Sequence, residues 1–308
     1  MDTRASNSME TERVSPRYRG IDLWKPGDIL DALIEAQFAA VAATHSARDS
    51  LGRAAEAIEA RIRYRGRLVY AGAGTSGRLA VQDGAELMPT FSWPEERLVL
   101  LIAGGRDALL KSVEGAEDET SHAARVIREH VIDSKDVMIA VAASGTTPFT
   151  LACLREAKSR GALTIGIANN RGTPLLEESD HPVFLDTGAE PIAGSTRMKA
   201  GTAQKIALNL LSTLVMISFG RVYDGLMVDV QAVNEKLVRR SEEMLIRLTG
   251  CSREAARDAL RRAHGSVKLA VMLLHGCDPK EGARLIDSAG GRLRSALSLI
   301  GTRETDAA

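Results

Sequence analysis

Residues 68–78, Leu68-Val69-Tyr70-Ala71-Gly72-Ala73-Gly74-Thr75-Ser76-Gly77-Arg78, contain the pattern that decides the fold. A short apolar run leads directly into a glycine-rich turn, and a helical pattern follows the turn. A continuous apolar run of this kind is typical of a strand that is buried on both faces of a sheet. The segment therefore predicts one strand, turn and helix unit of a layered α/β protein.

The same pattern recurs four times along the chain. Each further apolar run is ended by Gly, Ser or Asp and is followed by a helical pattern. The runs are residues 98–103, 137–142, 163–167 and 183–185. Together they predict a doubly wound, mostly parallel sheet flanked by helices. Ligands of such sheets bind beyond the carboxyl ends of the strands, so the turns there are the first candidates for a site.

The remaining segments predict a division into three parts. Residues 1–20 are polar and rich in Arg and Glu, which indicates an arm outside the core. Residues 21–249 form the sheet domain; apolar spacing predicts two helices over 26–63, a long apolar helix over 199–219 and another helix over 228–248. Residues 250–308 predict a small C-terminal helical subdomain of four short helices. One of these helices begins with an Asp278 N-cap, Pro279 at the first position and Glu281 at the third.

The composition excludes several classes of protein. The 308 residues include 44% apolar but only 4% aromatic residues, and 40 basic residues balance 40 acidic ones. A neutral chain with few aromatic residues lacks both the charge and the stacking surfaces that nucleic acid requires. The three cysteines lack the spacing of a disulfide framework or a thiolate metal site. Neither a signal peptide nor a membrane span is evident, so we expect a cytoplasmic protein.

Two turns are suited to a phosphate group. Gly74, Thr75 and Ser76 follow the first strand, and glycine allows close backbone approach while hydroxyls and a helix start supply donors. Ser144, Thr146 and Thr147 form a similar turn after the third strand. One such turn is often only tight packing, but two in one sheet favour a phosphate site. The first turn also fits GxGxxG, although the acidic residue that a dinucleotide site needs after the next strand is not evident.

A third polar segment, residues 188–199, leads into the long apolar helix. Ser195 and Thr196 are suited both to cap this helix and to donate to an anion, and Arg197 and Lys199 add positive charge. Ordinary capping explains the serine and threonine equally well. The basic pair favours an anion site.

The sequence contains no spacing typical of a metal site or a serine triad. The six histidines show no HExxH pattern, and no GxSxG turn is present, so we expect neither a metal nor another cofactor. Among the many carboxylates, Glu86 and Glu117 lie in weakly charged and glycine-containing stretches. The sequence alone favours exposed helix charges for both.

Taken together, these segments resemble the sugar isomerase (SIS) domain proteins and, among them, the N-acetylmuramic acid 6-phosphate etherases. The resemblance runs from Thr11-Glu12-Arg13 to about residue 240 and is looser beyond. Its most specific segments are residues 72–78, Val113-Glu114-Gly115-Ala116-Glu117-Asp118, Ala142-Ala143-Ser144-Gly145 and residues 194–205. One departure lies at Ala85-Glu86-Leu87-Met88-Pro89-Thr90, where the family commonly has Ser-Glu-Cys-Pro-Pro-Thr.

The resemblance implies a lyase of amino-sugar catabolism in cell-wall recycling. Its substrate would be N-acetylmuramic acid 6-phosphate, and the products of ether cleavage would be N-acetylglucosamine 6-phosphate and D-lactate. The family's catalytic glutamates fall on Glu86 as general acid and Glu117 as base. Two alternatives share the phosphate turns: a regulatory protein that binds sugar phosphates without turnover, and an aldose–ketose isomerase. The presence of both glutamates favours the etherase.

The spacing between Ser76 and Glu86 bears on the assembly of the site. An unbroken helix from Ser76 would carry Glu86 about 15 Å from the phosphate turn, at 1.5 Å per residue. This exceeds the length of one sugar. Either Gly84 breaks the helix or Glu86 serves a site shared with a second subunit, and we favour a homodimer with composite sites.

Overall fold

A computed structural model of the chain describes residues 9–230 and 235–306. They fall into two compact units. The first contains residues 9–85 and Glu96–Ser212, and the second contains Glu86–Glu95 and the described residues from Thr213 onward. Each unit has its own hydrophobic core.

The first unit is built on a parallel sheet of five strands in the order β2-β1-β3-β4-β5. Every residue of β1 and β3 is buried, which is why these strands read as unbroken apolar runs. The register pairs Gly72, the last residue of β1, with Ile102 and Val141 at the ends of its two neighbours. The predicted doubly wound sheet is confirmed. Its strands are β1 Leu68–Gly72, β2 Leu98–Ile102, β3 Val137–Val141, β4 Leu163–Ala168 and β5 His181–Phe184.

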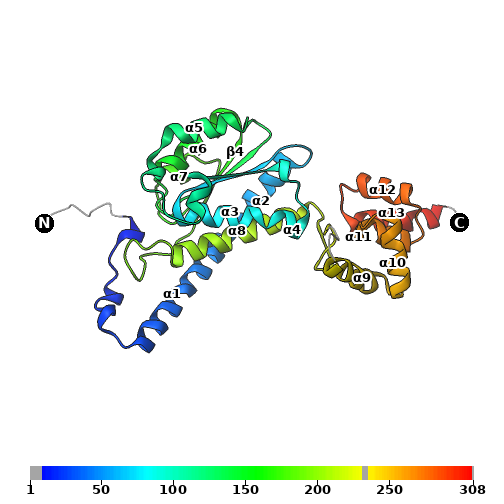
Figure 1. Cartoon of the computed structure of the whole chain (residues 1–308), viewed down its shortest axis with the longest axis horizontal. Coiled ribbons are helices and arrows are strands. Elements are labelled where there is room, and N and C mark those ends of the chain that lie inside the picture. Colours follow the sequence, from blue (N-terminus) through cyan, green and yellow to red (C-terminus); the bar gives the residue numbers. More distant parts are fainter. Residues whose placement is uncertain (1–8, 231–234, 307–308) are drawn as a thin grey trace. The chain divides into compact units, whose positions relative to one another are not determined.

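Helices cover both faces of this sheet. Figure 1 shows α5, α6 and α7 on one face and α2, α3 and α8 on the other. The bounds are α1 Pro26–Ser46, α2 Arg48–Ile62, α3 Gly74–Ala85, α5 Thr120–Glu129, α6 Pro148–Ser159, α7 Pro174–Glu178 and α8 Lys199–Ser218. By length and composition alone α8 would suffice to cross a membrane, but 56% of its apolar window is buried inside the protein, as is typical of a core helix.

The second unit is helical, with one small hairpin. Its elements are α4 Leu87–Phe91, β6 Val222–Tyr223, β7 Leu226–Met227, α9 Glu235–Thr249, α10 Arg253–Arg262, α11 Val267–Leu274, α12 Pro279–Ser288 and α13 Leu293–Asp306. The four predicted helices after residue 250 are all present. The predicted N-cap is confirmed too, because the Asp278 side chain accepts a hydrogen bond from the backbone of Glu281.

Two details of this unit differ from the sequence analysis. The helix expected over 228–248 begins at Glu235 instead of Val228: residues 228–230, which follow the β6–β7 hairpin, are not helical, and residues 231–234 lie outside the described residues. Met244 and Leu245 of α9 belong to the same buried core as the tail helices. That core therefore extends to residues ahead of 250.

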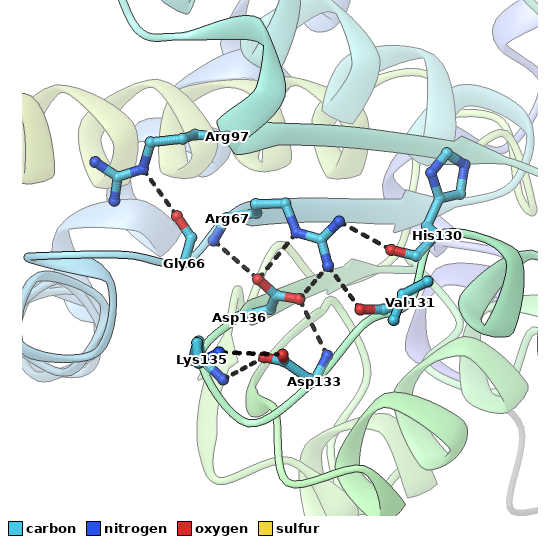
Figure 2. A network of polar contacts seen from close by, with 8 residues as sticks. All are labelled: Gly66, Arg67, Arg97, His130, Val131, Asp133, Lys135 and Asp136. Carbon is cyan, nitrogen blue, oxygen red and sulfur yellow. Dashed lines mark hydrogen bonds and ion pairs between the residues drawn. The ribbon is translucent and has the colours of Figure 1, made fainter.

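The amino edge of the sheet is fixed by an ion pair. The Asp136 carboxylate, just before β3, accepts hydrogen bonds from the backbone and guanidinium of Arg67, just before β1. The guanidinium also donates to the backbone oxygens of His130 and Val131 (Figure 2). The Asp136 side chain is only 2% exposed, so the pair ties the starts of two central strands together.

The predicted arm over residues 1–20 does not lie wholly outside the core in its described part, residues 9–20. This part contains two short 3-10 helices, η1 Glu10–Glu12 and η2 Pro16–Tyr18, and a third, η3 Ile21–Leu23, follows. Thr11 is completely buried and Tyr18 is nearly so. The charged residues around them stay exposed, which hides this burial from a reading of composition.

Candidate active site

The site begins where the strand order reverses, between β1 and β3. From this point the chain continues to β2 on one side and to β4 and β5 on the other. Such a reversal opens a crevice beyond the carboxyl ends of the two strands. Gly72, the last residue of β1, lies at the base of this crevice. A Cβ on it would lie 2.9 Å from the Gly77 backbone and 3.0 Å from the Val141 oxygen. Only glycine permits this packing of turn on sheet.

The turn after β1 presents unbonded backbone groups to the crevice. The first hydrogen bond of α3 runs from Gly77 N to Ala73 O, so the N–H groups of Gly74, Thr75 and Ser76 precede the helical ladder. Gly74 is exposed with φ +53°, Thr75 is half-buried and Ser76 is buried. This arrangement at a helix start is suited to an anion.

The turn after β3 lies beside it, because β1 and β3 are neighbours in register. The Ser144 Oγ accepts a hydrogen bond from Thr146 N at 3.2 Å and lies 3.3 Å from the Thr147 Oγ1. Thr147 precedes α6 but its side chain does not cap the helix. Ser144, Thr146 and Thr147 are half-buried, so their hydroxyls are partly accessible to a ligand.

The start of α8 is capped differently from the prediction. The carboxylate of Glu190 accepts hydrogen bonds from Lys199 N at 3.2 Å and Ala200 N at 2.9 Å, so Ser195 and Thr196 do not supply the cap. The cause is local: a buried carboxylate is a stronger acceptor for a helix start than a hydroxyl. Ser195 remains half-buried on the loop that precedes the helix.

Glu190 and Lys199 are both buried at this point, with 0% and 7% exposure. Burial raises the pKa of Glu190, while the two backbone N–H groups and Lys199 oppose the rise. Burial likewise lowers the pKa of the Lys199 ammonium, and the nearby Glu190 opposes that change. Arg197 lies exposed between them in sequence. The predicted basic pair is thus divided into one buried and one solvated cation.

The loop at the start of α8 lies next to the β1 turn. A Cβ on Gly201, in the first turn of α8, would approach the Thr75 methyl to 3.3 Å and the Thr196 oxygen to 3.1 Å. The three segments that the sequence singled out for phosphate binding therefore gather around one edge of the sheet. Their roles in binding stay predictions.

Glu117 lies beyond the carboxyl end of β2, at the same edge of the sheet. It is exposed on the short helix η6 Ala116–Asp118, which packs against α6 through the buried Ala116. Arg78 fixes the preceding loop, because its guanidinium donates to the backbone oxygens of Ala108 and Lys111. The sequence pattern gives Arg78 no role, although the residue directly follows the glycine turn.

Glu86 lies at the other end of α3. The helix runs unbroken through Gly84 to Ala85, so the possibility that Gly84 breaks it is wrong. Gly84 instead provides packing space: a Cβ there would lie 2.5 Å from a methyl of Leu100 in β2. Glu86 follows directly and is exposed. Ten residues of the chain therefore separate Glu86 from Ser76 in the turn that begins α3.

The described residues suggest no metal site. Within residues 9–230 and 235–306, no group of three His, Cys, Asp or Glu side chains is arranged to hold an ion. Buried polar residues that the sequence analysis did not single out lie near the candidate loops: Thr11, Asn169, Asn170, Glu190 and Gln204.

The fold and the paired hydroxyl-rich turns define a SIS-domain protein. Family models agree: the glucokinase regulatory protein N-terminal SIS domain matches residues 50–158, and the SIS domain matches residues 117–214. The chain is 50% identical over 288 residues to the N-acetylmuramic acid 6-phosphate etherase of Deinococcus radiodurans, across 93% of this chain and 94% of that protein. It is 41% identical over 290 residues to the etherase of Geobacillus thermodenitrificans, across 94% and 98%. The chain belongs to the N-acetylmuramic acid 6-phosphate etherase family.

Among solved structures, the chain is similar to a phosphoheptose isomerase from Francisella tularensis. The TM-score is 0.48 and the sequence identity is 17%, over 63% of this chain and all of that one.

Proposed function

We propose that the protein cleaves the D-lactyl ether of N-acetylmuramic acid 6-phosphate, giving N-acetylglucosamine 6-phosphate and D-lactate. The observation that carries the proposal is 50% identity to an etherase over 93% of the chain, with Glu86 and Glu117 both present. The turns at the β1–β3 reversal supply the anion-binding groups that a sugar phosphate needs.

The reaction divides into elimination and hydration. In the open-chain sugar the C2 proton is acidic because it lies next to the C1 aldehyde, and Glu117 as base removes it. The C3–O bond then breaks, and Glu86 as acid protonates the departing lactate oxygen. Water adds to the resulting C2–C3 double bond, its hydroxyl to C3 and a proton to C2. In sum, the ether and one water are converted into N-acetylglucosamine 6-phosphate, which carries the new C3 hydroxyl, and D-lactate.

The two glutamates need opposite protonation states at the start of the cycle. Glu117 must be ionised to accept the C2 proton and Glu86 protonated to donate one. Both side chains are exposed in a single chain, which offers nothing to distinguish them. Their different surroundings must therefore come from the substrate and from the assembled site.

We assign the phosphate to the three clustered segments. Backbone N–H groups and hydroxyls of Gly74, Thr75, Ser76, Ser144, Thr146 and Thr147 surround it, and Ser195, Arg197 and Lys199 complete the set. Because the phosphate is remote from C2 and C3, its binding energy orients the reacting carbons without taking part in the chemistry.

We further infer that the active form is a homodimer whose sites combine Glu117 of one subunit with Glu86 of the other. The unbroken α3 supports this, because it carries Glu86 about 15 Å from the turn at Ser76, at 1.5 Å per residue. Exposed apolar stripes at helical spacing offer interfaces for a second copy. On α1 the stripe is Leu30, Ile34, Phe38 and Val41, and on α8 it is Leu210, Leu214 and Ile217.

A cytoplasmic location fits the same account. The substrate is a phosphorylated sugar, and Cys153, Cys251 and Cys277 are all free thiols.

Release of D-lactate is the test that separates the candidate functions. The etherase produces D-lactate from N-acetylmuramic acid 6-phosphate, whereas a regulatory binding protein or an isomerase produces none. Binding of the sugar phosphate without lactate release would leave the regulatory alternative in place of the etherase.

Mixing two inactive variants tests the composite site. In a heterodimer of Glu86→Ala and Glu117→Gln subunits, one of the two shared sites keeps both native glutamates. Random reassociation of equal amounts should therefore restore about a quarter of wild-type activity. If each site used glutamates from a single chain, no combination would be active and the mixture would stay inactive.

A further inference from the structure

A reciprocal pair of hydrogen bonds joins the N-terminal segment to the end of β4. Thr11 N donates to Asn170 Oδ1 at 3.3 Å, and Asn170 Nδ2 donates to Thr11 Oγ1 at 3.0 Å. The residues are 159 positions apart, and their exposures are 0% and 3%. Because neither polar side chain has access to water, each bond constrains the positions of both segments.

Each partner also holds one of the candidate substrate loops. Asn170 Nδ2 donates to Ala143 O at 2.8 Å, directly before Ser144. Thr11 O accepts a hydrogen bond from Gly194 N at 2.9 Å, directly before Ser195. The series of bonds therefore runs from the β3 turn through Asn170 and Thr11 to the loop that precedes α8.

The N-terminal segment sits tightly on that loop. Gly194 has φ +77°, and a Cβ on it would lie 2.8 Å from a carboxylate oxygen of Glu12. A side chain at this position would both strain the backbone and displace Glu12. The close approach gives the contact between arm and loop a defined geometry.

Residues of the same segment line a cavity beside the β3 turn. Met9 and Glu10 share it with Thr146 and Asn170, and its volume is about 450 Å³. The N-terminal segment thus contributes surface next to the candidate phosphate turn as well as hydrogen bonds beneath it.

We propose that Thr11 and Asn170 are positioning residues of the sugar-phosphate site, which set the distance between the Ser144 turn and the Ser195 loop. The inference rests on the proposed function for its substrate. Neither residue is assigned a contact with substrate; they act through the two loops. A shift of an ångström in either loop removes donors from the phosphate, so the pair controls affinity more than chemistry.

The test compares Thr11→Val, which removes only the hydroxyl, with Thr11→Ser, which keeps it. Thr11→Val should raise the KM for N-acetylmuramic acid 6-phosphate and the Kd for N-acetylglucosamine 6-phosphate about tenfold, and change kcat less than about threefold. Thr11→Ser should restore both affinities. Unchanged KM and Kd in Thr11→Val would overturn the proposal.

Thr164→Val is the matched control. Thr164 is equally buried and its hydroxyl bonds Asp180 at the amino end of the sheet, far from the turns. The Thr164→Val substitution should lower the melting temperature without changing the KM or the Kd. An equal loss of affinity in Thr164→Val would show that Thr11 acts through general stability, against the proposal.

Coupling to the loop gives a second readout. In a Ser195→Ala background, Thr11→Val should weaken binding by much less than in the wild type, because the donor that it positions is already gone. Fully additive effects would contradict the proposed route. Binding measured by calorimetry does not depend on turnover, so failure of lactate release in the wild type would refute the etherase without touching this test.

Discussion

Glu190 caps the helix that begins at Lys199: its carboxylate lies 3.2 Å from the Lys199 backbone nitrogen and 2.9 Å from that of Ala200. The start of α8 therefore already holds an internal anion. The loop between the two residues carries Ser195 and Arg197, so this cap fixes both ends of a candidate substrate loop.

Removal of this cap should cost stability. Glu190→Ala leaves two buried N–H groups without an acceptor, and we expect the free energy of unfolding to fall by about 2 kcal/mol. Glu190→Gln keeps an acceptor oxygen and should lose less. Urea unfolding of both variants measures the difference; equal stability of Glu190→Ala and wild type would contradict the cap.

The same residue predicts a pH dependence. Burial raises the pKa of Glu190 above its ordinary 4.5, so the folded protein keeps this proton to higher pH than the unfolded chain. Its contribution to stability is present below about pH 4.5 and is lost as the pH rises through the raised folded-state pKa. The unfolding free energy of the wild type, relative to Glu190→Gln, should therefore fall from pH 4 to pH 7. A difference that stays constant or grows over this pH range would contradict the raised pKa of Glu190.

The phosphate assignment predicts a selective loss of affinity. Ser144→Ala should raise the Kd for N-acetylglucosamine 6-phosphate about five- to tenfold, because one charge-assisted hydrogen bond is lost. Binding of unphosphorylated N-acetylglucosamine should not change. Ser159→Ala at the exposed end of α6 is the control and should bind like the wild type. Calorimetry that shows equal losses for both sugars would place the phosphate elsewhere.

The ion pair between Arg67 and Asp136 (Figure 2) leads to a prediction about the stability of the fold. Arg67→Ala leaves the nearly buried Asp136 carboxylate without its guanidinium partner, and should lower the free energy of unfolding by about 3 kcal/mol. Arg125→Ala breaks only an exposed pair with Glu129 and should change stability by less than about 0.5 kcal/mol. Similar losses in the two variants would mean that the pair does not hold β1 and β3 together.

The sequence predicted the sheet well because its signals are local. Buried parallel strands appear as short apolar runs, and the glycine turns after β1 and β3 mark the edge where ligands bind. The predicted start of α9 was wrong because Val228 and Val230 fit the apolar spacing of a helix, whereas in the structure they are buried in the core without being helical. Gly84 was ambiguous because glycine weakens a helix, yet the close packing of α3 on Leu100 of β2 leaves no room for a side chain there.

The remaining site features depend on distant partners. The contact between Thr11 and Asn170 spans 159 positions, and no periodicity links the two. In the sequence, Glu190 is one acidic residue among many. Only the fold shows that its carboxylate caps the start of α8. The catalytic roles of Glu86 and Glu117 came from the family resemblance alone. The local sequence pattern favoured exposed charges for both, and in a single chain both side chains are exposed.

The division of work between Glu86 and Glu117 tests the central claim most directly, because C2 proton removal and C3–O cleavage have separate assays. Glu86→Ala should lower D-lactate release at least about a hundredfold while the C2 proton still exchanges with deuterated water. Glu117→Gln should abolish both release and exchange. If exchange is lost in the Glu86 variant and kept in the Glu117 variant, the two roles are reversed. If both variants release lactate at the wild-type rate, the elimination mechanism is wrong.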